Sequence, residues 1–372
     1  MKKIKVYLKK PWIFTDSPYY EYLTKNISPI IEYINVKNKN QWIIEDVKKF
    51  KMLNKLKRII KLTIRNFFPW LPNASITFTK KDYDLIHCAH CLSINKKPWV
   101  MDVEYVNQFW AGGITKKQKK IILNLLKSKY CKKIIAWTEW TKKEILKEFP
   151  EVANKIDVVY PAIPIQKINK RDKKEINLLF VSRRFYFKGG LHALEVMDRL
   201  TKKYDKVSAL VISDTPKEII DKYSKNKKIK FFSVISKEKL FSEVYPKTDI
   251  LVYPSYTDTF GFIILEALSF GIPIVTVGGQ SRKDLISDGK TGFVIKEPEK
   301  FNIKDLENLD TLKDTIKKIE FKTEILIKND RLRKKISKNA LKEFIVGKFS
   351  INKRNKKLEK IYNEALKQND NC

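Results

Sequence analysis

Two carboxylates stand eight residues apart in the stretch PSYTDTFGFIILEAL, on either side of a glycine that precedes an apolar helix. Asp258 comes before the predicted helix, and Glu266 lies about a turn and a half inside it. The backbone N–H groups at Phe260, Gly261 and Phe262 mark the helix start, where anions are favoured. Such a site suits a sugar nucleotide, although the spacing alone also fits an ordinary turn residue and an ordinary helix carboxylate.

A second group of charged residues follows the apolar run 177–181. The motif SRRFYFKGG carries Arg183 and Lys188 and leads into the helical run 191–204. A strand, a basic turn with a glycine pair and a helix together form a phosphate-binding element. The motif therefore predicts a diphosphate site, although a run of positive charge is also typical of a solvated surface.

The two motifs resemble those of the retaining GT-B glycosyltransferases of family 4, the glycosyl transferases group 1. The family signature is a Glu, seven residues and a second Glu, and here Asp258 stands at the first position. The family pattern Gly-Arg, four residues, Lys-Gly is matched at Arg183 and Lys188, with Ser182 in place of the glycine. The resemblance is strongest over residues 177–295.

The resemblance implies a hexosyltransferase-like enzyme that uses a nucleotide-diphosphate sugar as donor, retains the anomeric configuration and needs neither metal nor cofactor. The two cations then hold the diphosphate, Glu266 accepts from ribose hydroxyls and Asp258 from the donor sugar. The catalytic residues that it implies are Arg183, Lys188, Asp258 and Glu104. The donor-binding residues are Arg183, Lys188, Asp258, Phe260, Gly261, Phe262 and Glu266.

The acceptor side is predicted from the segment MDVEYVNQF. Family members often carry a His at the end of the corresponding strand, and the aligned position here is Glu104, with Asp102 beside it. Two acids at the carboxyl end of a parallel strand stand where α/β proteins bind ligands, although a solvated turn fits them equally well. His87, at the end of DLIH, is a further candidate and is at least as well explained as a hydrogen-bonding residue at the edge of the core.

Strands and helices alternate along the chain, which predicts an α/β fold with two Rossmann-like, doubly wound domains facing a central cleft, as in GT-B enzymes. Helices are expected at 116–130, 141–149 and from 312 onward. The expected domains are an acceptor domain over 1–168, a nucleotide-sugar domain over 169–345 and a C-terminal helix over 346–372 that crosses back to the first. The expected strands are 4–8, 84–88, 99–103, 133–137, 157–160, 177–181, 208–213, 229–232, 250–253, 274–277 and 292–295.

The chain of 372 residues has a formal net charge of +35, which indicates anionic partners: a nucleotide, a phospholipid surface or nucleic acid. A basic nucleic-acid-binding protein is therefore one alternative, but the paired acids favour a small-molecule site, and we expect no nucleic acid partner. A GT-B sugar-nucleotide epimerase is another alternative. The expected partners are a nucleotide sugar and a glycan or lipid-linked acceptor.

The segment 47–71 combines apolar residues at helical spacing with eight Lys or Arg between Lys48 and Arg65 and no acid. It fits an ordinary domain helix or an interfacial helix on an anionic membrane. Because the sequence contains no apolar run of spanning length and 1–10 is too charged for a signal peptide, we expect a cytoplasmic protein, with the inner face of the cell membrane as a hypothesis. The cluster HCAHC, 87–91, has adjacent ligands on opposite strand faces, so we expect no metal site.

Overall fold

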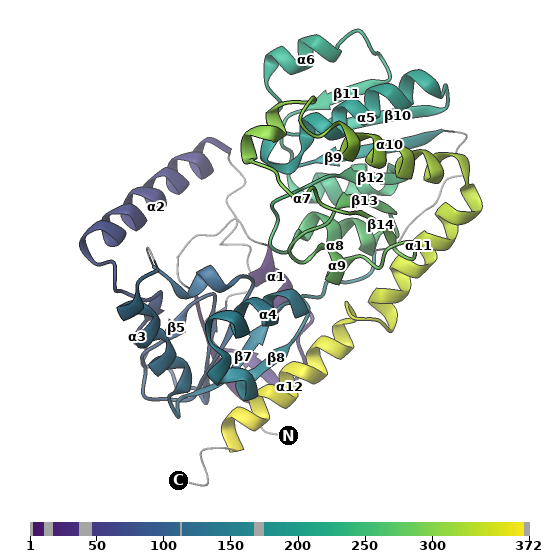
Figure 1. The fold of residues 1–372 in the computed structure, drawn as a ribbon. Coiled ribbons are helices and arrows are strands. Elements are labelled where there is room, and N and C mark those ends of the chain that lie inside the picture. The colour runs from purple at the N-terminus through teal and green to yellow at the C-terminus, as the bar shows by residue number, and fades with distance from the viewer. Residues whose placement is uncertain (1–2, 11–17, 37–46, 112–113, 167–174, 368–372) are drawn as a thin grey trace. The chain divides into compact units, whose positions relative to one another are not determined.

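The computed structural model describes residues 3–10, 18–36, 47–111, 114–166 and 175–367, and the chain forms two compact units (Figure 1). Unit 1 comprises residues 1–162 and 348–372, and unit 2 comprises residues 163–347. The C-terminal segment is thus grouped with the N-terminal one. The domain boundary predicted between residues 168 and 169 lies outside the described residues.

Unit 1 is built on a parallel sheet of six strands in the order β2-β1-β4-β6-β7-β8. Every residue of β4 and β6 is buried, as expected for parallel strands covered on both faces. Because β1 pairs with β2 on one side and with β4 on the other, the strand order reverses between β1 and β4. The strands are β1 Ile4–Lys9, β2 Ile31–Tyr33, β4 Leu85–Ala89, β6 Trp99–Val103, β7 Cys131–Ala136 and β8 Ile156–Val158, and a small pair joins β3 Ala74–Ser75 to β5 Leu92–Ser93.

The helices of unit 1 begin where the sequence supplies caps. The Thr115 side chain accepts from the backbone N–H of Gln118 at the start of α3, and Thr138 accepts from Thr141 at the start of α4. This cap starts α4 two residues before the predicted position. The helices are α1 Tyr19–Thr24, α2 Val47–Phe67, α3 Lys116–Lys127, α4 Glu139–Glu148 and α12 Ile351–Lys367.

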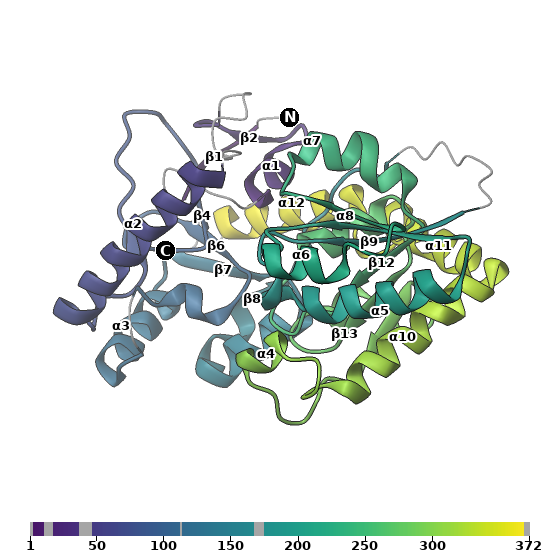
Figure 2. The same ribbon diagram turned by 90° about the horizontal axis from the view of Figure 1, so that it is seen from above.

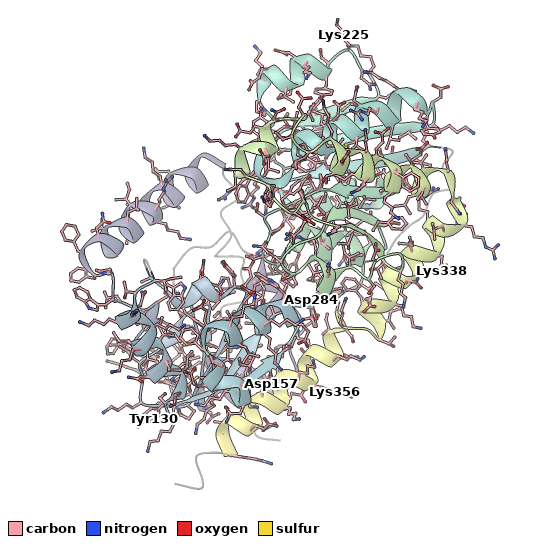
Figure 3. The ribbon with its side chains drawn as sticks, in the orientation of Figure 1. Tyr130, Asp157, Lys225, Asp284, Lys338 and Lys356 are labelled. Carbon is pink, nitrogen blue, oxygen red and sulfur yellow. The ribbon has the colours of Figure 1, made fainter. Side chains whose placement is uncertain are left out.

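Helix α12 packs against strands β4, β6 and β7 of unit 1. Lys133 on β7 forms an ion pair with Glu364 on α12 at 3.2 Å and with Asp157 on β8 at 2.9 Å (Asp157 is labelled in Figure 3). Arg354 on α12 is buried and donates to the carbonyl oxygen of Asn26, just beyond the end of α1, at 3.0 Å. These contacts make the last helix an integral part of the first unit.

Unit 2 has a second parallel sheet, in the order β11-β10-β9-β12-β13-β14. Its strand order reverses between β9 and β12, because the chain adds β10 and β11 on one side of β9 and β12 to β14 on the other. The strands are β9 Ile176–Val181, β10 Val207–Ile212, β11 Ile229–Phe232, β12 Ile250–Tyr253, β13 Ile274–Val277 and β14 Gly292–Ile295.

Helices cover both faces of this sheet. Helix α10 packs against α5, and α11 packs against α8, so that one pair lies on each side (Figure 2). The longer helices are α5 Gly190–Lys203, α6 Lys217–Tyr223, α8 Phe262–Ser269, α10 Lys313–Lys328 and α11 Asp330–Ile345. Within the described ranges, none of the helices combines the length and apolar character that crossing a bilayer requires.

Candidate functional site

The predicted cations and acids of unit 2 come from the two strands that flank the reversal of its sheet. Lys188 lies in the turn after β9, and Asp258 lies in the loop after β12. In doubly wound sheets the loops at the carboxyl ends of such neighbouring strands diverge and leave room for a ligand. The topology therefore brings together two motifs that are 70 residues apart in the chain.

The turn after β9 is held by its own side chains and glycines. Ser182, which stands where the family has a glycine, accepts through Oγ from the backbone N–H of Arg184 at 3.0 Å. Gly189 has a φ of +72°, and a Cβ atom there would lie 2.3 Å from the carbonyl oxygen of Pro254. Only glycine allows the turn after β9 to approach the end of β12 so closely.

Lys188 and Asp258 form an ion pair, with Nζ 3.2 Å from Oδ1. Lys188 Nζ also donates to the carbonyl oxygen of Thr257 at 2.7 Å, and Tyr253 donates its hydroxyl proton to Asp258 Oδ2 at 2.8 Å. Burial lowers the pKa of the Lys188 ammonium, and the adjacent carboxylate opposes that change. The two predicted residues are thus fixed against each other at the edge of the sheet.

Arg282, the first residue of α9 (Arg282–Leu285), is a cation beside this loop that the sequence motifs did not indicate. Its side chain is fully buried, and its guanidinium donates to the carbonyl oxygen of Asp258 and, at 3.2 Å, to that of Tyr256. Burial lowers the pKa of the Arg282 guanidinium, although nearby Asp258 opposes this. Arg282 therefore fixes the backbone of the loop that carries Asp258.

Helix α8 begins at Phe262, directly after Gly261, whose φ of +85° is left-handed. A Cβ atom at Gly261 would lie 3.3 Å from Asp258 Oδ2, so the acid lies beside the helix start. Phe260 is fully buried and its ring centroid lies 4.9 Å from that of Phe262. The first N–H groups of a helix have no intrahelical acceptor, which makes this helix start suitable for an anion.

Glu266 lies inside α8 and is 4% exposed. Its Oε2 accepts from the hydroxyl group of Tyr245 at 3.1 Å, and burial, followed by the charge of Glu266, raises the pKa of that tyrosine. Arg183 behaves differently from the other predicted donor residues, because it is exposed on the turn after β9. The structure thus brings Lys188 and Asp258 into contact and places Arg183 on the exposed side of the same turn.

His87 and Asp102 in unit 1 are also brought together. His87 lies on β4 and Asp102 on the adjacent β6, with Nε2 2.9 Å from Oδ2, and both side chains are fully buried. Tyr19 donates its hydroxyl proton to the same carboxylate oxygen. Burial acts to raise the pKa of Asp102, but His90, His87 and Tyr19 outweigh it and hold the pKa below its ordinary value.

The other ring nitrogen of His87 continues this chain to the C-terminal helix. Because Asp102 accepts from Nε2, the neutral ring accepts at Nδ1 from the Tyr362 hydroxyl, 2.6 Å away. The Tyr362 oxygen lies 2.9 Å from the hydroxyl group of Tyr33 on β2. His87 and Asp102 are therefore interior residues of a continuous hydrogen-bonded chain rather than parts of a solvated turn.

Glu104, directly after β6, is partly exposed. Its backbone N–H donates to Gln108 Oε1 at 2.9 Å, and its carbonyl oxygen accepts from the Thr141 hydroxyl at 2.8 Å. Its loop is thus fixed to the start of α4. Among the residues that the structure describes, no three His, Cys, Asp or Glu side chains are grouped as metal ligands.

Comparison with known proteins places a family match on unit 2. A family model described as Glycosyl transferases group 1 matches residues 163–343. A Klebsiella pneumoniae relative, "Uncharacterized 41.2 kDa protein in cps region", is 29% identical over 230 residues, which cover 58% of each chain. The chain spans a little over half the length of the first curated relatives that it matches.

Two solved structures resemble almost the whole chain. The glycosyltransferase from Rickettsia africae ESF-5 has a TM-score of 0.62 at 17% identity and covers 98% of this chain and 99% of its own. Anabaena HepE, in complex with UDP and glucose, has a TM-score of 0.57 at 14% identity and covers 96% and 98%. The fold is therefore GT-B, with two Rossmann-like α/β units. The group 1 match lies within the second of these units.

Proposed function

We propose that the protein is a retaining, metal-independent glycosyltransferase that moves a sugar from a nucleotide-diphosphate sugar to a glycan or lipid-linked acceptor. The contact between Lys188 and Asp258, beside the start of α8, carries this proposal. There, one edge of the sheet combines a cation that can bind a diphosphate with a carboxylate that can accept from sugar hydroxyl groups. The group 1 match over the same unit supports the assignment.

The donor is proposed to lie along the loops of unit 2. Lys188 and the amides at the start of α8 hold the diphosphate, with Arg183 reaching it from the exposed side of the turn. Glu266, oriented by Tyr245, accepts from ribose hydroxyls, and Asp258 accepts from the transferred sugar. The similarity to a protein whose structure holds UDP and glucose supports a uridine nucleotide as the first donor to test.

The reaction exchanges two bonds at the anomeric carbon. The bond to the leaving diphosphate oxygen breaks while a bond to the acceptor oxygen forms on the same face of the sugar. The acceptor hydroxyl proton passes to the diphosphate, which balances its negative charge. Lys188, Arg183 and the helix amides stabilise the charge that develops on the leaving group, which is the main task of the protein.

Donor turnover by purified variants tests this proposal. Arg183→Ala and Lys188→Ala are each expected to lower turnover of a UDP-, GDP- or ADP-sugar by about two to three orders of magnitude. The exposed Arg331→Ala serves as a matched control and is expected to act like wild type. Activity should persist in excess chelator. Wild-type turnover in both variants, or an absolute requirement for a divalent cation, would contradict the assignment.

A location at the cytoplasmic membrane face is proposed from α2 and the segment that follows it. Large apolar side chains are exposed there, among them Met52 at 63%, Phe67 at 69% and Phe68 at 50%. The same helix carries Lys55 and Arg58. Exposed apolar and basic side chains on one helix are typical of an interfacial helix on anionic lipid.

Vesicle sedimentation tests the location separately from catalysis. The protein should co-sediment with phosphatidylglycerol vesicles and remain in solution with phosphatidylcholine vesicles. Replacing Lys55, Lys57 and Arg58 by Gln is expected to release it, because each basic residue contributes about 1 kcal/mol at an anionic surface. Three Gln replacements in unit 2, at Lys217 and Lys222 on α6 and at Lys225 just after it, provide a control of equal number. Equal sedimentation of wild type and the α2 variant would refute the membrane location.

A further inference from the structure

Three adjacent strands of unit 1 deliver polar and aromatic side chains to one edge of the sheet. β4, β6 and β7 are neighbours and run parallel, so their carboxyl ends lie together. His90 follows β4, Glu104 and Tyr105 follow β6, and Trp140 lies in the first turn of α4, which follows β7. The edge beside β1 and β4 is also where the strand order reverses, which is the usual ligand position in such sheets.

Tyr105 and Trp140 form a stacked pair at this edge. Their ring centroids are 5.6 Å apart with an interplanar angle of 14°, and both residues keep partial exposure to solvent. The hydrogen bond from Thr141 to the Glu104 carbonyl oxygen ties the loop of one ring to the helix of the other. The pair is therefore a rigid, partly exposed aromatic surface.

His90 stands apart from the other histidines by its backbone and its exposure. Its φ is +63°, a left-handed conformation that is costly for a residue with a side chain. It is 8% exposed, whereas His87 and His192 are fully buried. Strain of this kind often persists where a side chain must be presented to a ligand, and here it presents the one histidine with solvent access.

The neighbours of His90 determine which ring nitrogen accepts a hydrogen bond. Gln108 Oε1 accepts from the Glu104 backbone N–H at 2.9 Å, which identifies this atom as the amide oxygen. His90 Nδ1 lies 3.1 Å from the same oxygen and 3.4 Å from Asp102 Oδ1, so Nδ1 must carry the proton. In the neutral ring, Nε2 then holds a lone pair that can accept from a hydroxyl group.

Aromatic side chains fix the plane of the His90 ring. Its centroid lies 4.9 Å from that of buried Trp137 at an interplanar angle of 65° and 5.8 Å from that of Tyr20 at 78°. Because the ring is packed against these aromatic side chains and bonded at Nδ1, its remaining nitrogen has one fixed direction. The site thus combines a preformed hydrogen-bond acceptor with a preformed aromatic surface.

We propose that this edge is a subsite for a pyranose ring of the acceptor. The ring stacks its C–H face on the Tyr105–Trp140 pair, while one of its hydroxyl groups donates to His90 Nε2. Aromatic rings suit this role because a pyranose presents an apolar face and polar edges together. The inference rests on the proposed glycosyl transfer and specifies that the acceptor end is itself a sugar rather than a lipid phosphate.

Binding of simple glycosides to the full chain tests the subsite without any donor. Methyl β-D-galactopyranoside and methyl α-D-glucopyranoside serve as probes in saturation-transfer NMR, and sorbitol, which has hydroxyl groups but no ring face, serves as the control ligand. Wild type should bind at least one glycoside and give its strongest transfer at ring C–H protons. Binding of sorbitol with equal affinity, or of neither glycoside at the solubility limit, would overturn the subsite.

Matched variants separate the two parts of the subsite. Trp140→Ala is expected to weaken the glycoside about tenfold, the upper range for loss of an aromatic contact. Trp70→Ala, which removes another partly exposed tryptophan of unit 1, should leave the affinity unchanged. His90→Asn keeps a residue that tolerates left-handed backbone but removes Nε2, and should weaken binding several-fold. Wild-type affinity in both Trp140→Ala and His90→Asn would refute the proposal.

Donor binding by the same variants distinguishes this inference from the proposed function. Calorimetric titration with the UDP-, GDP- and ADP-sugars should give wild-type donor affinity in Trp140→Ala and His90→Asn. If wild type binds a donor but no glycoside, the subsite is wrong and the donor site stands. If wild type binds glycosides but no nucleotide sugar, the glycosyl transfer on which the inference rests is wrong.

Discussion

Removing the Lys188 ammonium is expected to destabilise unit 2, because it leaves the Asp258 carboxylate largely buried and without its cation. The two side chains are 17% and 15% exposed, and their charged atoms are 3.2 Å apart. At an effective dielectric constant of about 20, their attraction is about 5 kcal/mol. Desolvation opposes much of this attraction, so we expect Lys188→Met to lower the free energy of unfolding by about 3 kcal/mol.

A double-mutant cycle isolates the ion pair from the other contacts of these residues. Asp258→Asn is expected to cost about 2 kcal/mol, and the double variant little more than Lys188→Met alone. The expected coupling free energy is therefore about 2 kcal/mol, within the usual range for contacting residues. Additive effects, with a coupling below about 0.5 kcal/mol, would refute the buried ion pair as a determinant of stability.

The distribution of tryptophan provides the assay. All seven tryptophans lie in residues 1–162, so tryptophan fluorescence reports the unfolding of unit 1 and not of unit 2. Hydrogen exchange of peptides from β9 and β12 in increasing urea measures unit 2 directly. We expect the four proteins of the cycle to differ in that exchange while their fluorescence transitions coincide. A matching shift in fluorescence would show that the variants act on the whole chain.

Three further predictions follow from buried contacts. Tyr362→Phe removes the hydroxyl donor of His87 Nδ1 and should lower the stability of unit 1 by about 1–3 kcal/mol, measured by tryptophan fluorescence in urea. Gly189→Ala should lower the free energy of unfolding of unit 2 by about 3 kcal/mol or more, because its Cβ would lie 2.3 Å from a backbone oxygen. Gly289 has a φ of +69° and open space around it, so Gly289→Ala should lower that free energy by only about 1 kcal/mol in the same hydrogen-exchange assay. Burial raises the pKa of the Cys131 thiol to about 12, so iodoacetamide at pH 8 should label it only after unfolding. The folded pKa of Cys131 lies above the ordinary thiol value of 9.0. The buried neutral thiol therefore makes its full contribution to the free energy of unfolding below pH 9.0, and this contribution is lost as the pH rises from 9.0 toward 12.

Local sequence patterns predict most of the strands well. The predicted strands 229–232, 250–253, 274–277 and 292–295 coincide with β11 to β14, because each is a short, mostly apolar run bounded by turn residues. β2, which has three residues at the sheet edge, was not predicted, since its Ile-Glu-Tyr sequence has no distinctive length or pattern. The start of β7 was placed two residues late because Cys131 and Lys132 continue the strand through a charged residue.

Of the residues in the candidate sites, local sequence patterns likewise predict some and miss others. Lys188 and Asp258 each stand in a motif with local signals, namely glycines and a following helix, and the sheet topology then brings them together. Arg282 gives no such signal, because its role depends on two carbonyl oxygens that lie 24 and 26 residues away in the chain. Tyr362 and His87 are separated by 275 residues, so no sequence window contains both. Contacts that depend on the folded backbone cannot be predicted from spacing.

The placement of α12 in unit 1 has a consequence for synthesis on the ribosome. Unit 2 is one continuous segment, so all its strands are available once residue 347 has emerged, whereas unit 1 needs residues from both ends of the chain. Until α12 has been made, His87 lacks its hydrogen bond with Tyr362, and the carbonyl oxygen of Asn26 lacks its hydrogen bond from Arg354. The nascent N-terminal sheet therefore lacks these hydrogen bonds and the helix that covers it until α12 is made, and the unit translated second can be the first to reach its final structure.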